Sequence, residues 1–287
     1  MLRYAYFPGC SSKSTSLEYH ISCKKVAEKL GINLIELENS NCCGTHVMED
    51  YNKKIWLALN ARNLALAEEK KCDLATICSS CYLNSKKAKI ILDNDEEKKR
   101  EINQILKKIN RKYYGNVKIK HILEILVKDY GIERLKEKVT MPLDIKAVPY
   151  YGCQIIRPPE ITNFDDPENP STFETLLDAL GCEVISLPQR TECCGAPLTL
   201  IDQKLYHSML KKLLNSLVQS NADCIVTLCP LCHHALDSGQ IIFKLKRKIP
   251  VLHITQIIGL ALGLSPKEIA LDKNLVETKP LIKKSTY

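Results

Sequence analysis

The sequence predicts an α/β protein made of two similar domains, each with a mainly parallel sheet flanked by helices. Short β-branched or aromatic segments alternate with helical segments of about 12 to 20 residues, which is typical of βαβ units with right-handed crossovers. One arrangement of five cysteines also occurs twice, which indicates an internal repeat. A chain of 287 residues suits two domains. Turn residues at Met141-Pro142 interrupt the pattern, so we predict domains over residues 1–141 and 142–287.

The first half of each repeat contains two strands and one helix. Each copy opens with a short aromatic strand that runs into Gly-Cys, over residues 4–10 and 148–153. A helix is predicted next, over 16–30 and 171–180, and each helix is followed by a C-cap glycine, Gly31 or Gly181. A β-branched strand then leads into Cys-Cys-Gly. These strands are predicted over 32–37 and 183–187.

The second half of each repeat supplies the remaining elements. A second helix, over 51–70 and 204–220, precedes a buried strand that runs straight into Cys-x-x-Cys. Those buried strands are predicted over 73–77 and 223–228. Both copies then carry a strand and helix with the pattern His-Ile-x-x-Ile. Its histidines, His121 and His253, are internal counterparts, so we interpret them as structural.

The two cysteine sets have matching spacing. Each set has a single cysteine, an adjacent pair followed by glycine, and a closing Cys-x-x-Cys motif. The second member of the pair precedes the next cysteine by 35 residues in both copies, from Cys43 to Cys78 and from Cys194 to Cys229. The first set is Cys10, Cys42, Cys43, Cys78 and Cys81, and the second set is Cys153, Cys193, Cys194, Cys229 and Cys232. Such agreement predicts a duplicated metal-binding unit.

Composition and charge indicate where in the cell the protein acts and which kinds of partner it binds. Residues 1–13 contain no apolar signal segment, and the apolar stretch 257–264 is too short to span a bilayer, so we expect a cytoplasmic protein with no membrane span. Fourteen cysteines in a reducing compartment favour metal ligands over disulfides. The net charge of +8 does not favour nucleic acid, because the lysines are scattered with few aromatics between them. It fits anionic substrates or an acidic partner.

The predicted topology brings each set together. All five thiols of a set follow the carboxyl ends of predicted strands, which share one edge of a parallel sheet. The Cys-x-x-Cys motif opens a helix whose N-terminal N–H groups favour an anionic cluster. The glycine after each cysteine pair can supply the positive φ that lets both thiols face one site. Four further cysteines lie outside the sets, and we expect them to pack in the core: Cys23, Cys72, Cys182 and Cys224.

The number of thiols leaves alternatives open. A structural zinc ion takes four ligands, and so does an ordinary cubane cluster, which leaves one thiol of each set spare. Five converging thiolates therefore imply either a spare ligand or an unusual cluster with a bridging cysteine. A zinc-stabilised scaffold without a redox role remains a rival interpretation.

These motifs resemble the twin cysteine-rich CCG domains in the B subunit of heterodisulfide reductase, and the resemblance covers nearly the whole chain. Cys78-Ser79-Ser80-Cys81 and Cys229-Pro230-Leu231-Cys232 are its Cys-x-x-Cys motifs. The resemblance implies that each five-cysteine set holds a non-cubane 4Fe–4S cluster and that the two clusters face a shared cavity. It further implies that the heterodisulfide CoM-S-S-CoB binds between the clusters and is split reductively in methanogenesis, each sulfur being captured by iron. No side-chain general base is then required.

The resemblance also implies partners. No ferredoxin-type Cys-x-x-Cys-x-x-Cys segment precedes the repeats, so electrons should arrive from the separate C subunit of a heterodisulfide reductase. The flavin-containing A subunit, and a hydrogenase or formate dehydrogenase, would lie upstream. Related chains are iron–sulfur subunits of flavin-dependent hydroxy-acid or succinate dehydrogenases. An electron-transfer subunit of such a complex is therefore the alternative function.

Contacts to the anionic substrate are predicted from charge and position. Cations beside the ligand loops are suited to sulfonate, phosphate and carboxylate groups, and histidines flanking the cluster loops are suited to donate protons to the departing thiolates. The same histidines would serve equally well as hydrogen-bond donors to cluster sulfurs or as helix caps. The candidate residues are Lys13, Arg157, Arg190, His46, His233 and His234.

Overall fold

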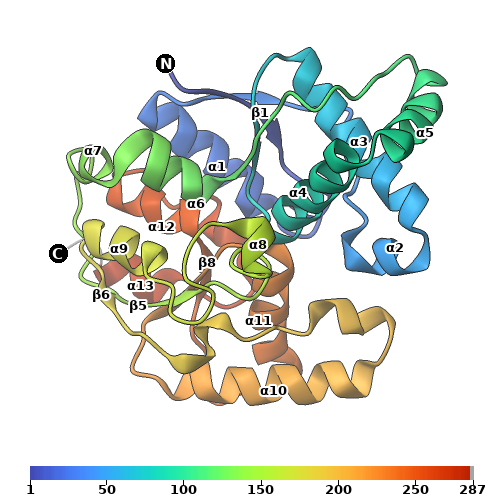
Figure 1. The fold of residues 1–287 in the computed structure, drawn as a ribbon. Coiled ribbons are helices and arrows are strands. Elements are labelled where there is room, and N and C mark those ends of the chain that lie inside the picture. Colours follow the sequence, from blue (N-terminus) through green and yellow to red (C-terminus); the bar gives the residue numbers. More distant parts are fainter. Residues whose placement is uncertain (285–287) are drawn as a thin grey trace.

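Two four-stranded parallel sheets, one from each half of the chain, form the framework of the protein (Figure 1). The computed structural model describes residues 1–284. The strand order is β2-β1-β3-β4 in the first sheet and β6-β5-β7-β8 in the second, so the two halves share one topology. The first sheet contains β1 (Arg3–Phe7), β2 (Asn33–Glu36), β3 (Leu74–Thr76) and β4 (Ile119–His121). The second contains β5 (Lys146–Tyr150), β6 (Glu183–Val184), β7 (Cys224–Thr227) and β8 (Val251–His253).

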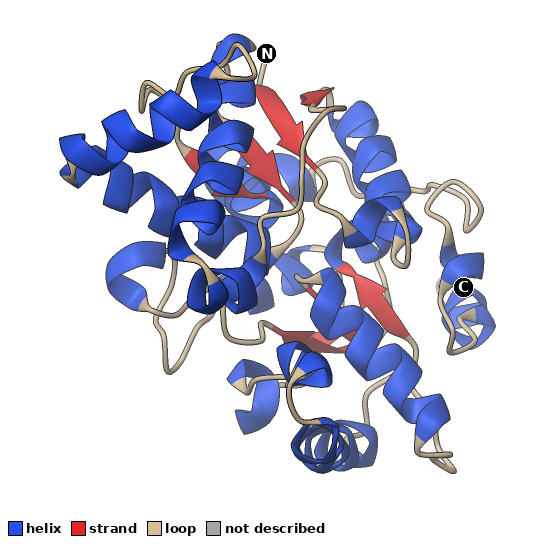
Figure 2. Ribbon diagram, turned by 90° about the vertical axis from the view of Figure 1, so that its right-hand side faces the viewer, coloured by secondary structure: helices blue, strands red, loops and turns tan. Residues whose placement is uncertain are grey.

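Helices cover both sheets (Figure 2). Those of the first half are α1 (Leu17–Leu30), α2 (Thr45–Tyr51), α3 (Lys53–Glu69), α4 (Ser79–Asn94), α5 (Glu96–Lys107), α6 (Ile122–Glu124), which continues as a π-helix (Ile125–Gly131), and α7 (Ile132–Lys136). Those of the second half are α8 (Pro159–Thr162), α9 (Thr172–Ala179), α10 (Gln203–Gln219), α11 (Pro230–Ile242), α12 (Ile254–Ala261) and α13 (Lys279–Lys284). The predicted α/β class with two mainly parallel sheets is confirmed.

Local signals fix the ends of several helices. Gly31 follows α1 with φ of +69°, and its N–H bonds the Ala27 and Glu28 carbonyls, as expected of a left-handed C-cap. The side chains of Asn52 and Asp202 cap the equivalent helices α3 and α10 by accepting a backbone N–H.

Three differences from the sequence prediction concern segment lengths. The helix α2 was not predicted, and β6 has two residues where five were expected. The proline-rich stretch from Pro158 to Pro170, which the sequence suggests is an inserted loop, includes the short helix α8. The boundary at 141/142 lies between α7, which ends at Lys136, and β5, which begins at Lys146, and it stays a prediction.

The two halves interlock through buried polar contacts. Helix α1 of the first half packs against α12 of the second. Within that contact the Ser22 hydroxyl lies 2.6 Å from the Thr255 hydroxyl, and both side chains are fully buried. The Tyr19 hydroxyl lies 2.6 Å from the Thr227 hydroxyl at the end of β7. Since buried hydroxyls are costly without partners, these pairs fix how the halves sit together.

Candidate functional site

The first five-cysteine set gathers at the carboxyl end of the first sheet. Cys10 follows β1 and Cys78 follows β3, so parallel strand ends bring distant loops together. The Cys10 and Cys42 sulfurs are 3.5 Å apart. Neighbouring thiols then shift one another's pKa values, from Cys42 to Cys43, from Cys43 to Cys81 and from Cys81 to Cys78. All five thiols therefore form one connected group.

The second set repeats this pattern at the second sheet. Neighbouring thiols of this set shift one another's pKa values, from Cys153 to Cys193, Cys193 to Cys194, Cys194 to Cys232 and Cys232 to Cys229. The order of contacts is that of the first set, position for position. The duplicated spacing in the sequence therefore corresponds to duplicated geometry.

The two sets meet at the Cys-x-x-Cys motifs. The sulfurs of Cys78 and Cys229 are 3.9 Å apart, although 151 residues separate them in the chain. Both residues are N-caps, of α4 and α11, and the Cys78 sulfur accepts the Cys81 N–H at 3.5 Å. Helix N-termini favour negatively charged groups, so both motifs suit thiolates.

A glycine after each cysteine pair makes the turn that both thiols need. Gly44 has φ of +82° and Gly195 has φ of +73°, a region that favours glycine. The N–H of each glycine bonds the sulfur two residues earlier, Cys42 or Cys193, at 3.4 Å. The predicted positive φ is confirmed at both positions.

Mutual hydrogen bonding shifts the thiol pKa values in opposite directions. In the second set, hydrogen bonds from Cys153 and Cys194 lower the pKa of Cys193 to about 2. The hydrogen bond to Cys193, together with burial, raises the pKa of Cys153 well above its ordinary value. Five thiols in contact cannot all ionise unless a cation offsets their charge. The donor set therefore fits a cofactor of positively charged metal ions and thiolate ligands.

A metal cofactor is supported by the number and chemistry of these thiols. Within residues 1–284, no group of three or more His, Cys, Asp or Glu side chains is placed so that it could hold a single metal ion. The four cysteines outside the sets are all buried, as expected for core packing: Cys23, Cys72, Cys182 and Cys224.

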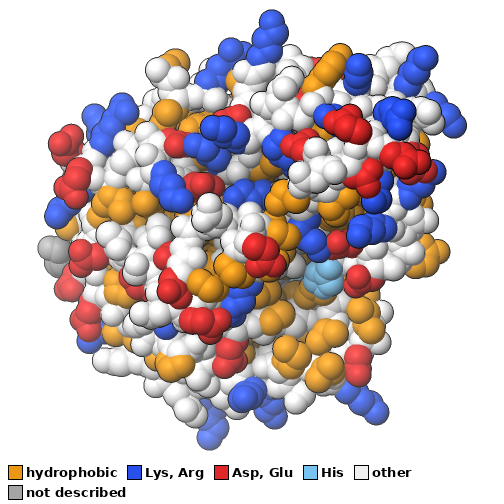
Figure 3. All heavy atoms as spheres, viewed as in Figure 1, with side chains coloured by type: hydrophobic (Ala, Val, Ile, Leu, Met, Phe, Trp, Pro, Cys, Tyr) orange, Lys and Arg blue, Asp and Glu red, His pale blue; other side chains and the backbone are white. Residues whose placement is uncertain are grey.

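A cavity of about 280 Å³ opens onto the second set. Its wall includes all five cysteines of that set, and two residues of the first half, His46 and Ser79, complete it. Those cysteines are Cys153, Cys193, Cys194, Cys229 and Cys232. The rest of the wall is Tyr151, Gln154, Gly195, Pro197, Leu198, Ile201 and Leu231. No Lys, Arg, Asp or Glu lines this cavity among the described residues. Figure 3 shows this face of the molecule hollowed between the two lobes.

The three predicted cations lie outside the cavity wall. Lys13 forms an ion pair with Glu36 at 3.0 Å. Arg157 donates to the Thr191 carbonyl at 3.1 Å and pairs with Glu168. Their side chains remain partly exposed, at 38% and 35%.

Arg190 is held by internal partners. It pairs with Glu174 at 3.0 Å, donates to the Asn169 side chain at 2.7 Å and donates to the Leu187 carbonyl. Its side chain is only 11% exposed. These contacts hold the arginine within the second half, and it does not line the cavity.

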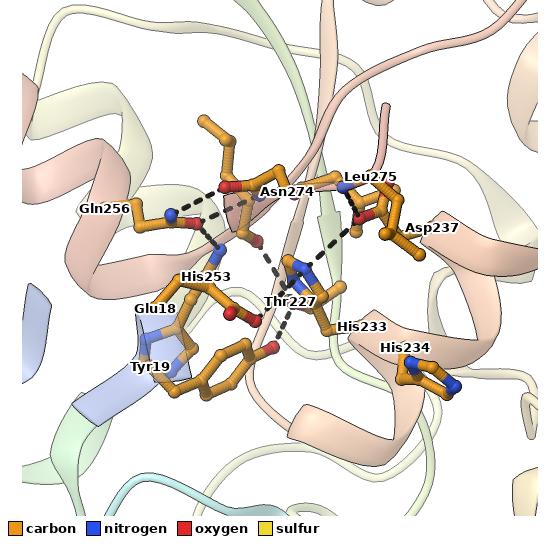
Figure 4. A network of polar contacts seen from close by, with 12 residues as sticks. Glu18, Tyr19, Thr227, His233, His234, Asp237, His253, Gln256, Asn274 and Leu275 are labelled. Atoms are coloured by element: carbon orange, nitrogen blue, oxygen red, sulfur yellow. Dashed lines mark hydrogen bonds and ion pairs between the residues drawn. The ribbon is translucent and has the colours of Figure 1, made fainter. Parts of the chain in front are cut away.

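The three predicted histidines have different surroundings. His46 lines the cavity, and its Nδ1 lies 3.3 Å from the Gln154 amide nitrogen. His233 is buried outside the cavity wall, and its Nε2 lies 3.5 Å from Glu18 and 3.7 Å from Asp237 (Figure 4). His234 is exposed.

Nothing in the sequence indicated that the carboxylates of Glu18 and Asp237 would lie next to His233. Burial raises the pKa of Glu18 to about 7 and that of Asp237 to about 6. Burial also lowers the pKa of His233 to about 3, so the imidazole is neutral. Glu18, Asp237 and the neutral His233 form a buried polar group next to the second cysteine set. Tyr19 packs edge-on against the His233 ring.

His121 and His253 occupy the structural positions expected of them. Each is fully buried and caps the helix that follows its strand through a ring nitrogen. His121 Nε2 also lies 3.0 Å from the Leu228 carbonyl of the other half. His253 stacks on Tyr19, with ring centroids 3.7 Å apart.

The chain matches known proteins over nearly its full length. A family model described as CCG, cysteine-rich domain, matches residues 4–85 and 147–237. The 8-methylmenaquinol:fumarate reductase membrane anchor subunit of Wolinella succinogenes is 37% identical over 97% of this chain and 98% of its own length. The B subunit of the ferredoxin:CoB-CoM heterodisulfide reductase of Methanosarcina mazei is 35% identical over 96% of this chain and 95% of its own length.

A solved structure has the same fold. A hypothetical protein from Helicobacter pylori aligns with a TM-score of 0.77 and 19% identity. The alignment covers 96% of this chain and 52% of that protein. Separately, no helix in the described part of this chain is long and apolar enough to cross a membrane.

Proposed function

Because the chain belongs to the CCG family of cysteine-rich proteins and is related to the B subunits of heterodisulfide reductases, we propose that it is the catalytic iron–sulfur subunit of a heterodisulfide reductase. Each five-cysteine set would hold one non-cubane 4Fe–4S cluster. The reaction is the cleavage of CoM-S-S-CoB, in which two electrons and two protons convert the disulfide into the thiols coenzyme M and coenzyme B.

One observation carries this proposal. All five thiols of the second set lie in the wall of a cavity, and the Cys78 and Cys229 sulfurs bring the first set to within 3.9 Å of that set. A subunit that only relays electrons needs no cavity at its cofactor, whereas a subunit that reduces a small molecule does. Bound iron–sulfur clusters would supply the electrons for breaking the S–S bond.

The chain's own residues would orient the substrate and handle a proton. Leu198 and Leu231 make the wall apolar, which suits the carbon chains of a disulfide and excludes water from it. His46 is the wall residue suited to deliver a proton to a departing thiolate, and Gln154 orients its ring. Charged ends of the substrate would lie outside the cavity. Substrate contacts by Lys13, Arg157, Arg190, His233 and His234 stay predictions.

The test is an anoxic assay of the isolated chain with a reduced viologen dye and the heterodisulfide. We expect turnover, together with about eight irons and matching sulfide for each chain. Cys42→Ser and Cys193→Ser, at equivalent positions of the two sets, should each lose about half of the iron. Cys182→Ser, a buried cysteine outside the sets, is the matched control and should keep all of it. One zinc ion in each set, without sulfide, would overturn the proposal.

A second candidate is an electron-transfer subunit of a flavin-dependent hydroxy-acid, succinate or fumarate complex. The relative named as a fumarate reductase subunit, matched over nearly its whole length, favours it. In that case the isolated chain would take up electrons at its clusters but would not turn over the heterodisulfide. Electron uptake without turnover therefore separates the two candidates.

The partners follow from the first candidate. The C subunit of the heterodisulfide reductase would donate electrons and the flavin-containing A subunit would lie upstream, fed by a hydrogenase or formate dehydrogenase. Co-purification of the chain with these subunits from its host would support this arrangement. The cytoplasmic location and the domain boundary at 141/142 stay predictions.

A further inference from the structure

One edge of the second half of the chain exposes large hydrophobic side chains beside lysines. Among the described residues, thirteen large hydrophobic side chains are exposed, and five of them lie around α10. Leu200 is 81% exposed, Ile201 69% and Ile242 55%. The other two are Leu205 and Ile241. Single exposed aliphatic residues need no explanation, but a group of five around one helix indicates an interaction surface.

The same edge is strongly basic. Lys204, Lys211 and Lys212 lie on the exposed side of α10, and Asp202 is the one acidic residue between positions 193 and 222 of the sequence. The segment after α11 adds three more exposed lysines, Lys244, Lys246 and Lys248. Within the described part of the chain, none of the six lysines is paired with a carboxylate. Figure 3 shows basic side chains along the lower edge of the molecule, where Figure 1 places α10.

Two contacts fasten the segment after α11 to α10. The Phe243 ring packs edge-on against His207 of α10, with centroids 5.6 Å apart. Arg247 donates to the Val218 carbonyl at 2.7 Å and to the Ala222 carbonyl at 2.8 Å, at the C-terminal end of the helix. The segment therefore runs alongside α10. We call these residues together the basic–apolar surface: Leu200, Ile201, Lys204, Leu205, Lys211, Lys212, Ile241, Ile242, Lys244, Lys246 and Lys248.

We propose that the basic–apolar surface binds peripherally to a membrane that contains anionic lipids. Exposed aliphatic side chains would enter the boundary between headgroups and acyl chains, while unpaired lysines would meet anionic headgroups. A nucleic acid would use the lysines but leave the five aliphatic side chains in water, so a lipid surface fits both features. Binding of this kind needs no membrane-spanning helix.

The surface is continuous with the cavity. Ile201 belongs to the basic–apolar surface and also lines the cavity at the second cysteine set. Contact with a bilayer would therefore place the cavity mouth close to the lipid. This inference rests on the charges and exposure of the second lobe, and it holds whichever of the two proposed functions is correct.

The test is flotation of the cluster-loaded chain with vesicles of phosphatidylcholine, with and without about one-third phosphatidylglycerol. We expect binding only to the anionic vesicles. Two variants separate the contributions: Lys211→Glu with Lys212→Glu, and Leu200→Ser with Leu205→Ser. Each should weaken binding about tenfold or more and leave iron content unchanged, since these side chains are exposed.

The matched control is in the other lobe, where Lys107, Lys108 and Ile109 are also exposed, basic and apolar. Lys107→Glu with Lys108→Glu, and Ile109→Ser, should leave binding unchanged. Equal binding to both vesicle types, or equal losses in the control variants, would overturn the proposal. Tight binding to duplex DNA that the Leu200→Ser, Leu205→Ser variant retains, with no vesicle binding, would assign the surface to nucleic acid instead.

Discussion

Replacing Gly44 by alanine should destabilise the protein more than the same change at Gly195 or Gly31. All three glycines have φ between +69° and +82°, and a Cβ in this region costs about 1–2 kcal/mol. At Gly31 the added Cβ would meet nothing within 4 Å, so that variant measures the backbone cost alone. The three positions therefore form a graded series with one backbone conformation.

The difference arises from what the added carbon would touch. At Gly44 it would lie 2.7 Å from the Met48 Cβ, which is fixed to the α2 backbone and cannot swing away. Such overpacking costs about a further 1–3 kcal/mol. At Gly195 the nearest atom, on the Tyr206 ring, would lie 3.4 Å away, which is ordinary contact. We expect losses of about 1–2 kcal/mol for Gly31→Ala and Gly195→Ala, and about 2–5 kcal/mol for Gly44→Ala.

The measurement is anoxic thermal unfolding followed by circular dichroism, with iron content determined in parallel. A loss of 1 kcal/mol lowers Tm by about 2–4 °C in a chain of this size class. The Tm of Gly44→Ala should therefore fall clearly below those of the other two variants. A Gly44→Ala variant as stable as Gly31→Ala would refute the steric argument, because it would mean that the turn opens without cost.

Three further predictions concern buried polar groups and helix caps. The raised pKa of Glu18, about 7 in the folded chain, means that the folded state binds more protons than the unfolded state between pH 4.5 and 7. The contribution of Glu18 to the free energy of unfolding therefore falls as pH rises through that window. We expect the Glu18→Gln variant to be more stable than the parent protein at pH 8 and equally stable below pH 4.5. Tyr19→Phe removes the hydroxyl that bonds Thr227 and the Cys229 carbonyl, and should cost about 1–3 kcal/mol in urea unfolding. Asn52→Ala and Asp202→Ala should each cost about 1 kcal/mol.

Each of these has a contradicting result. A Glu18→Gln variant whose stability changes with pH as the parent's does would place the titrating group elsewhere. A Tyr19→Phe variant with unchanged unfolding free energy would mean that a water molecule replaces the hydroxyl. Caps that can be removed without loss would mean that tertiary packing alone sets the ends of α3 and α10.

The repeat made much of the fold predictable. Matching strand and helix signals in both copies predicted the two parallel sheets, and glycine and cysteine spacing predicted the turns at Gly44 and Gly195. Helix α2 was missed because residues 45–51 are largely polar and half-exposed and show no helical stripe. The repeat did not help to predict α2, because the equivalent residues of the second copy, 196–200, form only a short 3₁₀ helix.

The surroundings of the site were less predictable because they depend on contacts between the halves. Ser79 belongs to one copy but lines the cavity of the other, and Glu18 comes near His233 only when α1 crosses to the second half. No periodicity in the sequence encodes such an approach. Arg190, a cation next to a ligand loop, is ion-paired with Glu174, a partner that nothing in the sequence indicated.

Hydrogen bonds from the first half of the chain to the second bear on how the protein evolved and on whether its halves can fold apart. The Leu228 carbonyl, next to a second-set cysteine, is bonded by Ser79 and His121 of the opposite half. A single-copy ancestor would have needed another identical chain to brace its own cysteine loop, so it is expected to have been a symmetric dimer. Either half expressed alone should leave that loop without its braces.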